Sequence, residues 1–358
     1  MTARTFGHTD VAVSPISLGC WIFGVDWWGH RTQDDCDRMC DLALDQGITF
    51  FDNGDAYGNG RAEELFGNWL GKIPADKSER VQIGGKFGYD WHNDPGEKGS
   101  HRERKQDFST EHINRMLDDS LRRLGTDRID VYLAHNIKLP HFHDDLFAQC
   151  EKWVEQGKIG TWGVSLGPAI GWREEGFQAM GDHGAKVVQT VYNVLEQHPA
   201  RELGEMATSC GAGILARVQD HSGILKDAVK KEAHPSGSDH RKFRDANWRI
   251  HGPAKADMLR PIAQGHGMTM HQFACKWLFQ QPALTSITAT LTTDDEIREI
   301  AAVPDLPDIT PDELNQIQEW YHDDFGLGAD AHPCDIKSSV AEGGSERSQY
   351  APGPTIIA

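Results

Sequence analysis

Residues 47–58 read Gly47-Ile48-Thr49-Phe50-Phe51-Asp52-Asn53-Gly54-Asp55-Ala56-Tyr57-Gly58. An apolar, β-type run ends at Asp52, and a turn-rich loop then leads to Tyr57. A carboxylate at the end of a buried strand is costly unless another group pairs with it. The stretch therefore predicts a strand whose end carries chemistry, with Tyr57 close enough to share its pocket.

Two later apolar runs end in the same way. Residues 81–86 finish at Lys86, and residues 129–135 finish at His135. An aspartate, a tyrosine, a lysine and a histidine at successive strand ends form a set that can transfer protons.

The rest of the chain alternates between short apolar runs and segments with helical spacing. The expected strands are residues 15–18, 48–51, 81–86, 129–135, 159–165, 187–191, 213–216 and 284–288. The expected helices are residues 34–46, 61–70, 110–124, 144–156, 171–180, 200–210, 254–264, 269–280, 294–302 and 311–320. Eight strand–helix units after an N-terminal hairpin at 4–14 predict a (β/α)8 barrel. An open doubly wound sheet is disfavoured because no strand is followed by a G-x-G-x-x-G turn.

We expect a single barrel domain over residues 1–327 and an extended tail over residues 328–358, which is rich in Gly, Ser, Asp and Pro. The formal net charge of -18 argues against nucleic acid or an anionic membrane as a main partner. No apolar run approaches the ~20 residues of a membrane span, and no secretory signal is visible. Seven scattered cysteines fit reduced thiols better than a disulfide framework, so we expect a cytoplasmic protein.

In a barrel, the carboxyl ends of the strands meet at one mouth. The polar residues expected there are Asp52, Lys86, His135, Ser165, Gln189 and Arg217. The charge of Lys86 would favour the phenolate of Tyr57 and lower its pKa, while Asp52 would hold Lys86 in place. His135 could donate a hydrogen bond to a reacting oxygen. Tyr57 would then give a proton to a carbonyl oxygen, a reaction without a protein nucleophile that calls for hydride from a nicotinamide.

Four motifs carry a family resemblance. Residues 51–58 with 63–67, 85–88, 120–135 and 157–165 closely resemble the aldo-keto reductase signature, and the resemblance extends over about residues 4–325. It implies a (β/α)8 barrel that binds NAD(P)H without a Rossmann motif and interconverts an alcohol with an aldehyde, ketone or sugar carbonyl. By this resemblance, the catalytic tetrad is Asp52, Tyr57, Lys86 and His135.

The resemblance also implies a cofactor site. Its residues would be Gly19, Cys20, Trp21, Asp52, Ser165, Leu166, Gln189, Arg217, Ser222, Gly223 and Leu225. Family members usually have Asn where this chain has Leu166, which removes one hydrogen bond to the carboxamide. Where NADPH-preferring members place basic residues, this chain has Asp294, Asp295 and Glu296. A 2′-phosphate would be poorly received there, so the sequence predicts that NADH competes well with NADPH or is preferred.

The substrate is expected to be a small carbonyl compound or sugar. Residues 20–28 read as an aromatic loop that forms either a satellite core or a pocket wall. The expected substrate-binding residues are Trp21, Trp27, Trp28, Tyr57 and His135. The basic run 101–105 is either a solvated face or a site for an anionic group of the substrate. The sequence carries no indication of the oligomeric state.

Two alternative functions stay open at this point. Barrels of this family can serve as non-catalytic, cofactor-sensing subunits, although the intact tetrad argues against that role. A metal-dependent hydrolase could use His135, His141 and His143, but Lys86 would place a cation in the same mouth. Cys36 and Cys40 lie one helical turn apart without a second ligand pair, so we expect no metal site.

Overall fold

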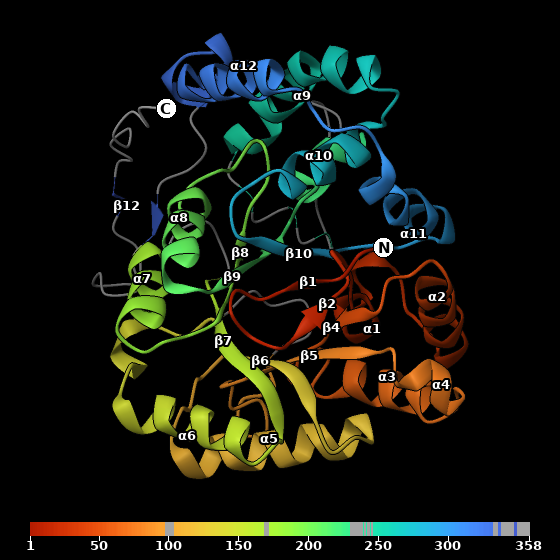
Figure 1. Cartoon of the computed structure of the whole chain (residues 1–358), viewed down its shortest axis with the longest axis vertical. Coiled ribbons are helices and arrows are strands. Elements are labelled where there is room, and N and C mark those ends of the chain that lie inside the picture. The colour runs from red at the N-terminus through yellow and green to blue at the C-terminus, as the bar shows by residue number, and fades with distance from the viewer. Residues whose placement is uncertain are drawn as a thin grey trace.

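The computed structural model describes residues 1–96, 104–167, 172–229, 239, 241, 244, 246–331, 336–337 and 347–348. Its centre is a closed barrel of eight parallel strands in the order β10-β3-β4-β5-β6-β7-β8-β9 (Figure 1). The strands are β3 (Ile16–Gly19), β4 (Phe50–Asp52), β5 (Gln82–Phe87), β6 (Ile129–His135), β7 (Ile159–Ser165), β8 (Val187–Val191), β9 (Gly213–Arg217) and β10 (Leu284–Ala289). The predicted (β/α)8 barrel is confirmed.

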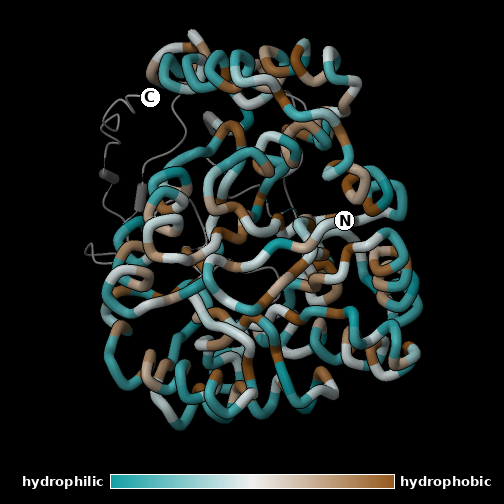
Figure 2. The backbone as a smooth tube through the Cα atoms, in the orientation of Figure 1, coloured by the Kyte–Doolittle hydropathy of each residue, from teal (hydrophilic) through white to brown (hydrophobic). Residues whose placement is uncertain are grey.

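Helices surround the barrel, and hydrophilic segments dominate their outer faces (Figure 2). They are α2 (Gln33–Asp45), α3 (Arg61–Leu70), α5 (Thr110–Leu124), α6 (Asp144–Glu155), α7 (Arg173–Gly181), α8 (Ala200–Cys210), α9 (Ala246–Gly265), α10 (Met270–Phe279), α11 (Asp294–Ala301) and α12 (Pro311–His322). Local sequence sets their ends. Thr32 and Asp35 form a capping box at the start of α2, and Gly125 ends α5 in the left-handed conformation.

The predicted N-terminal hairpin is also confirmed, with β1 (Arg4–Thr5) antiparallel to β2 (Ala12–Val13). It buries Phe6 and Val13 against residues of the barrel strands that include Phe50 and Val187. Phe50 and Val187 each begin their strand. The hairpin therefore closes the end of the barrel that lies opposite the carboxyl ends of the strands.

Three segments differ from the prediction. Residues 20–28 are not a plain loop, because a short helix α1 (Trp21–Gly24) and a 3₁₀ turn (Asp26–Trp28) form there, with Ile22 and Phe23 buried. The helix predicted over 254–264 starts earlier than expected, since α9 begins at 246 and continues through Pro253. A short helix α4 (Ala75–Ser78) was not predicted.

Two predicted segments lie mainly outside the described residues. Residues 101–103 of the basic run are among them, and so is most of the tail beyond residue 331. Within the tail, β11 (Ile336–Lys337) pairs antiparallel with β12 (Arg347–Ser348). The boundary between barrel and tail stays a prediction. In the described part of the chain, no helix has the length and apolar character needed to span a membrane.

Candidate active site

Three neighbouring strands bring the four candidate catalytic residues together. Asp52 ends β4, Lys86 is the penultimate residue of β5, and His135 ends β6. Tyr57 lies in the turn between β4 and α3. Its ring is 5.8 Å from the ring of His135, centre to centre. The arrangement expected from the strand ends is therefore present in the fold.

A buried ion pair forms the base of the site. Lys86 Nζ donates to Asp52 Oδ1 at 2.7 Å and to the Asn53 carbonyl oxygen at 2.8 Å. Burial alone would lower the pKa of Lys86, but the Asp52 carboxylate and Tyr57 outweigh it and raise that pKa above its usual value. The ammonium charge is thus fixed inside the barrel.

Tyr57 lies beside this charge, with Lys86 Nζ 4.9 Å from the centre of its ring. Burial raises the pKa of Tyr57, and the charge of Lys86 opposes the rise without cancelling it. The decrease expected from the sequence is therefore not found, because desolvation of the phenolate outweighs the lysine. Tyr57 is protonated at neutral pH, as a proton donor must be.

His135 is held as a neutral imidazole. Burial, followed by the charges of Lys86, Arg217 and Arg104, holds its pKa well below the usual range. Its Nδ1 is buried and has no hydrogen-bond partner among the described residues. Gln106 donates to the backbone carbonyl of His135 at 3.0 Å and thereby holds the strand end. A neutral imidazole can still donate one hydrogen bond to a reacting oxygen.

A chain of hydrogen bonds crosses the mouth from β7 to β4. Ser165 donates to Gln189 Oε1 at 2.9 Å, and Gln189 Nε2 donates to Asp52 Oδ2 at 3.0 Å. Gln189 also contacts the Thr288 hydroxyl at 3.3 Å. Sequence reasoning missed Thr288, although its position next to the end of β10 could have identified it.

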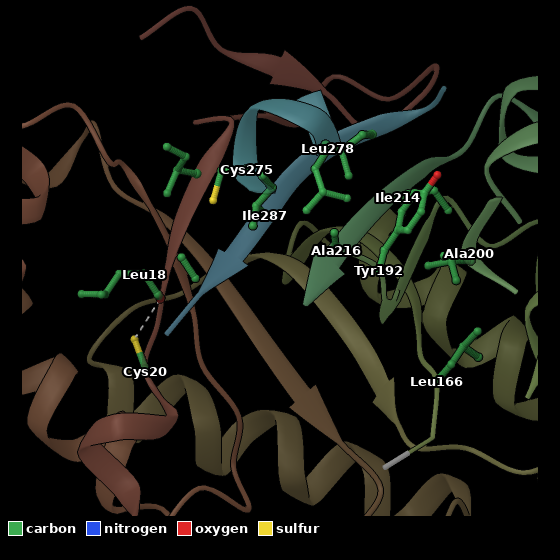
Figure 3. Close-up of a cluster of buried hydrophobic side chains, with 14 of the residues drawn as sticks. Leu18, Cys20, Leu166, Tyr192, Ala200, Ile214, Ala216, Cys275, Leu278 and Ile287 are labelled. Atoms are coloured by element: carbon green, nitrogen blue, oxygen red, sulfur yellow. Dashed lines mark hydrogen bonds between the residues drawn. The ribbon is translucent and has the colours of Figure 1, made fainter. Parts of the chain in front are cut away.

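Three residues predicted to bind the cofactor have their side chains in the hydrophobic core. Cys20 and Leu225 are fully buried, and Leu166 is almost so. Figure 3 shows Cys20 donating weakly to the Leu18 carbonyl, and Leu166 belongs to the same buried hydrophobic cluster. Arg217 donates to the Leu166 carbonyl at 3.0 Å. These three residues could contact the cofactor only through backbone atoms, and their role in cofactor binding stays a prediction.

A polar cluster holds the segment that contains Ser222 and Gly223, a 3₁₀ turn (His221–Lys226) with positive φ at both residues. Arg244 donates to Ser222 Oγ at 2.8 and 2.9 Å and to the buried Glu196 at 2.5 Å. Burial would raise the pKa of Glu196, but Arg244 and His221 hold it well below its usual value. Glu196 and Arg244 could not be identified from the sequence, because their contacts join segments distant along the chain.

The aromatic side chains of the 20–28 segment lie beside Tyr57. Trp21 lies 6.0 Å from Tyr57, and Trp27 lies 4.7 Å from Trp21, centre to centre. Trp28 also packs on the core. The segment therefore combines both interpretations, a wall beside Tyr57 and an extension of the core.

The acidic segment forms the first turn of α11, and two of its acids bind cations from other elements. Glu296 pairs with Lys226 at 2.8 Å, and Asp294 pairs with Arg38. Asp295 lies on the surface. The negative charge predicted at this position is present, together with two bases that it neutralises.

The histidines of the metal alternative have other contacts. His143 accepts a hydrogen bond from the Leu146 amide at 3.2 Å and caps α6, and His141 packs on Phe108. Within the described ranges, no group of three or more potential ligands is placed to hold a metal ion.

Several known proteins are similar to this chain over most of its length. A probable voltage-gated potassium channel subunit beta from Arabidopsis thaliana is 27% identical over 333 residues, which cover 89% of this chain and 96% of that protein. An NADH-specific methylglyoxal reductase from Escherichia coli is 27% identical over 312 residues, 83% of this chain and 91% of that protein.

A solved structure and a family model agree with these similarities. The glycerol dehydrogenase of Gluconobacter oxydans has the same fold, with a TM-score of 0.75 at 23% identity over 88% of this chain and 94% of that one. The model of the aldo/keto reductase family matches residues 15–322. With the match spanning the whole barrel, the chain belongs to the aldo/keto reductase family.

Proposed function

We propose that the protein is an NAD(P)H-dependent oxidoreductase that interconverts an alcohol with an aldehyde, ketone or sugar carbonyl by hydride transfer. The observation that carries the proposal is the Asp52–Lys86 ion pair beside Tyr57, with the His135 ring also in contact with the phenol ring. Family membership supports the cofactor class.

The donor set around the mouth fits such a cofactor. Ser165 and Gln189 offer a hydroxyl and an amide for a carboxamide, and Arg217 offers a cation near the same edge. Ser222 accepts hydrogen bonds from Arg244, which leaves its own O–H free to donate to an anionic oxygen such as that of a pyrophosphate. A bound nicotinamide would supply or accept the hydride.

The side chains of this chain would manage the proton. In the reducing direction, Tyr57 gives its phenolic proton to the carbonyl oxygen as negative charge develops there. Lys86 stabilises the phenolate left behind, and Asp52 fixes Lys86. His135 donates a hydrogen bond to the same oxygen and orients the substrate. Solvent then returns the proton to Tyr57.

The acids of α11 support the use of NADH. Lys226 and Arg38, two bases that other elements bring to this turn, are already paired with Glu296 and Asp294. A 2′-phosphate would have to compete with these carboxylates for them. The similarity to an NADH-specific reductase points in the same direction.

A second candidate is a non-catalytic, cofactor-binding subunit, which the similarity to a probable potassium channel subunit favours. The complete set of Asp52, Tyr57, Lys86 and His135 argues for turnover instead.

One experiment separates these possibilities. The protein is titrated with NADH and with NADPH while tryptophan fluorescence is followed, because Trp21, Trp27 and Trp28 lie beside Tyr57. Each complex is then mixed with methylglyoxal and L-glyceraldehyde 3-phosphate while absorbance of the reduced nicotinamide is recorded. Consumption establishes the oxidoreductase, whereas binding without consumption on a wider carbonyl panel favours the subunit. Binding of NADPH more than about tenfold tighter than NADH, ~1.4 kcal/mol, would refute the cofactor preference.

A further inference from the structure

A second buried cluster of ionisable groups lies next to the turn that carries Tyr57. Asp55 belongs to this turn, Glu63 to α3 and Arg123 to α5. Asp55 and Glu63 are fully buried, and the Arg123 side chain is 7% exposed. None of the three has a part in the proton transfer proposed above.

The contacts of the two carboxyl groups differ. Glu63 Oε2 accepts from Arg123 Nε at 2.7 Å, a direct ion pair. Asp55 Oδ2 accepts from the indole Nε1 of Trp91 at 3.3 Å, and the Ala56 amide also donates to the carboxyl group. Asp55 Oδ1 is buried without a well-formed partner among the described residues. The guanidinium of Arg123 lies 5.4 Å from the centre of the Trp91 ring and so connects the two halves of the cluster.

The cluster therefore holds two carboxyl groups and one guanidinium. A second buried negative charge without a cation is strongly unfavourable, so one carboxyl group keeps its proton. Glu63 has the ion pair, and burial followed by the charge of Glu63 raises the pKa of Asp55 to about 8. The phenol of Tyr132 on β6 also faces Asp55, and burial raises its pKa. The carboxylate of Asp119 on α5 acts on Glu63 and Arg123. Asp55 is therefore the carboxyl group that is protonated at neutral pH.

The same cluster supports the backbone around Tyr57. The Asp55 carbonyl accepts from the Gly60 amide at 2.8 Å and closes the turn. Arg123 lies against Gly60 so closely that a Cβ there would be 3.0 Å from Arg123 Cδ. The Tyr57 carbonyl accepts from the Ala62 amide at 3.1 Å, at the start of α3. A movement of Asp55 away from Glu63 would therefore displace the phenol.

We propose that Asp55 is a positioning residue for Tyr57, and that the turn keeps its shape only while Asp55 and Glu63 share a single negative charge beside Arg123. The inference rests on the proposed role of Tyr57 as proton donor. Loss of the Asp55 proton places two negative charges against one guanidinium, pushes the turn away from α3 and reduces turnover on the alkaline side.

The test is the ratio of kcat at pH 9 to kcat at pH 7, measured with methylglyoxal and NADH. For the wild type we expect a ratio of about 0.1, because a group that titrates near pH 8 is about nine-tenths ionised one unit higher. Asp55→Asn has no proton to lose, and we expect a ratio close to 1. Glu63→Gln removes the other carboxylate of the pair, so it should also abolish the loss of kcat at pH 9. Glu64→Gln, an exposed acid on the same helix, is the matched control and should keep the wild-type ratio.

The possible outcomes are distinguishable. Wild-type turnover with superimposable profiles for Asp55→Asn and the wild type would overturn this inference and leave the proposed function intact. Absence of wild-type turnover on the whole carbonyl panel would overturn the proposed function and this inference with it. If Asp55→Asn fails to fold by circular dichroism, the Glu63→Gln profile decides, and an unchanged alkaline loss there refutes the shared charge.

Discussion

Lys86 carries a full positive charge inside the barrel, and the oxygens of Asp52 and Asn53 hold it there. A buried charge that loses its partner is far more costly than a surface pair that breaks. The same ion pair that tunes Tyr57 is therefore a part of the stability of the barrel mouth.

Lys86→Met should show this cost. The substitution leaves the Asp52 carboxylate buried without a cation, and we expect the free energy of unfolding to fall by about 3–5 kcal/mol. Urea unfolding at pH 7 measures it. The double variant Asp52→Asn with Lys86→Met removes both charges and should recover part of the loss. Equal midpoints for Lys86→Met and the wild type would mean that the pair does not stabilise the mouth.

Tyr57→Phe removes only the proton donor. The ring, the turn and the Asp52–Lys86 pair stay in place, so we expect cofactor dissociation constants within about twofold of the wild type. The reduction rate should fall by about 10²–10⁴, the usual contribution of a positioned general acid. Fluorescence titration and single-turnover kinetics measure the two effects separately. A variant that reduces methylglyoxal at nearly the normal rate would exclude Tyr57 from the mechanism.

At the scale of elements, the first turn of α11 combines helix capping with a charge that faces a basic side chain. Glu296 accepts from the Thr292 amide at 2.6 Å and pairs with Lys226 from the segment after β9. Burial would raise the pKa of Glu296, but Lys226 and Thr292 lower it overall. The carboxylate is thus charged across the neutral range.

Glu296→Gln should change the cofactor preference. The substitution frees Lys226 for a 2′-phosphate, and we expect the ratio of NADPH affinity to NADH affinity to rise by about tenfold, ~1.4 kcal/mol. Parallel fluorescence titrations give the ratio. Asp295→Asn is the control, because its carboxylate is on the surface and pairs with Arg298 in the same helix. A ratio that moves equally in both variants would refute a specific role of Glu296.

The elements also explain what the sequence could predict. Strand ends follow from apolar runs that stop at a polar residue, so Asp52, Lys86 and His135 were found with their neighbours. The start of α9 was missed because Pro253 lies inside the helix and normally marks a boundary. Glu196 and Arg244 could not be found, since their pairing depends on the tertiary fold. The rise in the pKa of Tyr57 depends on burial, which the sequence does not quantify.

For the whole molecule, the N-terminal hairpin and the proposed chemistry lie at opposite ends of the barrel. The proposed catalytic residues lie at the carboxyl ends of the strands, and the N-terminal hairpin packs at the opposite end. Phe6 of this hairpin is fully buried and lies 6.2 Å from Phe50, centre to centre.

Phe6→Ala should therefore reduce stability without reducing turnover. We expect a loss of about 3–5 kcal/mol in the free energy of unfolding, as for other buried aromatic truncations, with kcat within about twofold of the wild type. Urea unfolding and steady-state kinetics measure the two quantities. Asp10→Ala, an exposed change in the same hairpin, should alter neither. A large fall in kcat for a Phe6→Ala variant that is fully folded would show that the hairpin end of the barrel is coupled to the catalytic end.

The closure of the barrel by β3 and β10 has a consequence for synthesis on the ribosome. The Ser17 hydroxyl donates a hydrogen bond to the hydroxyl of Thr288, 271 residues later. The first barrel strand therefore cannot pair with the last one until nearly the whole barrel has been synthesised. Until β10 leaves the exit tunnel, the nascent sheet has two unpaired edges, one at β3 and one at β9. Such edges can pair with other chains. A product truncated before residue 284 would keep both edges open and become a substrate for chaperones and proteases.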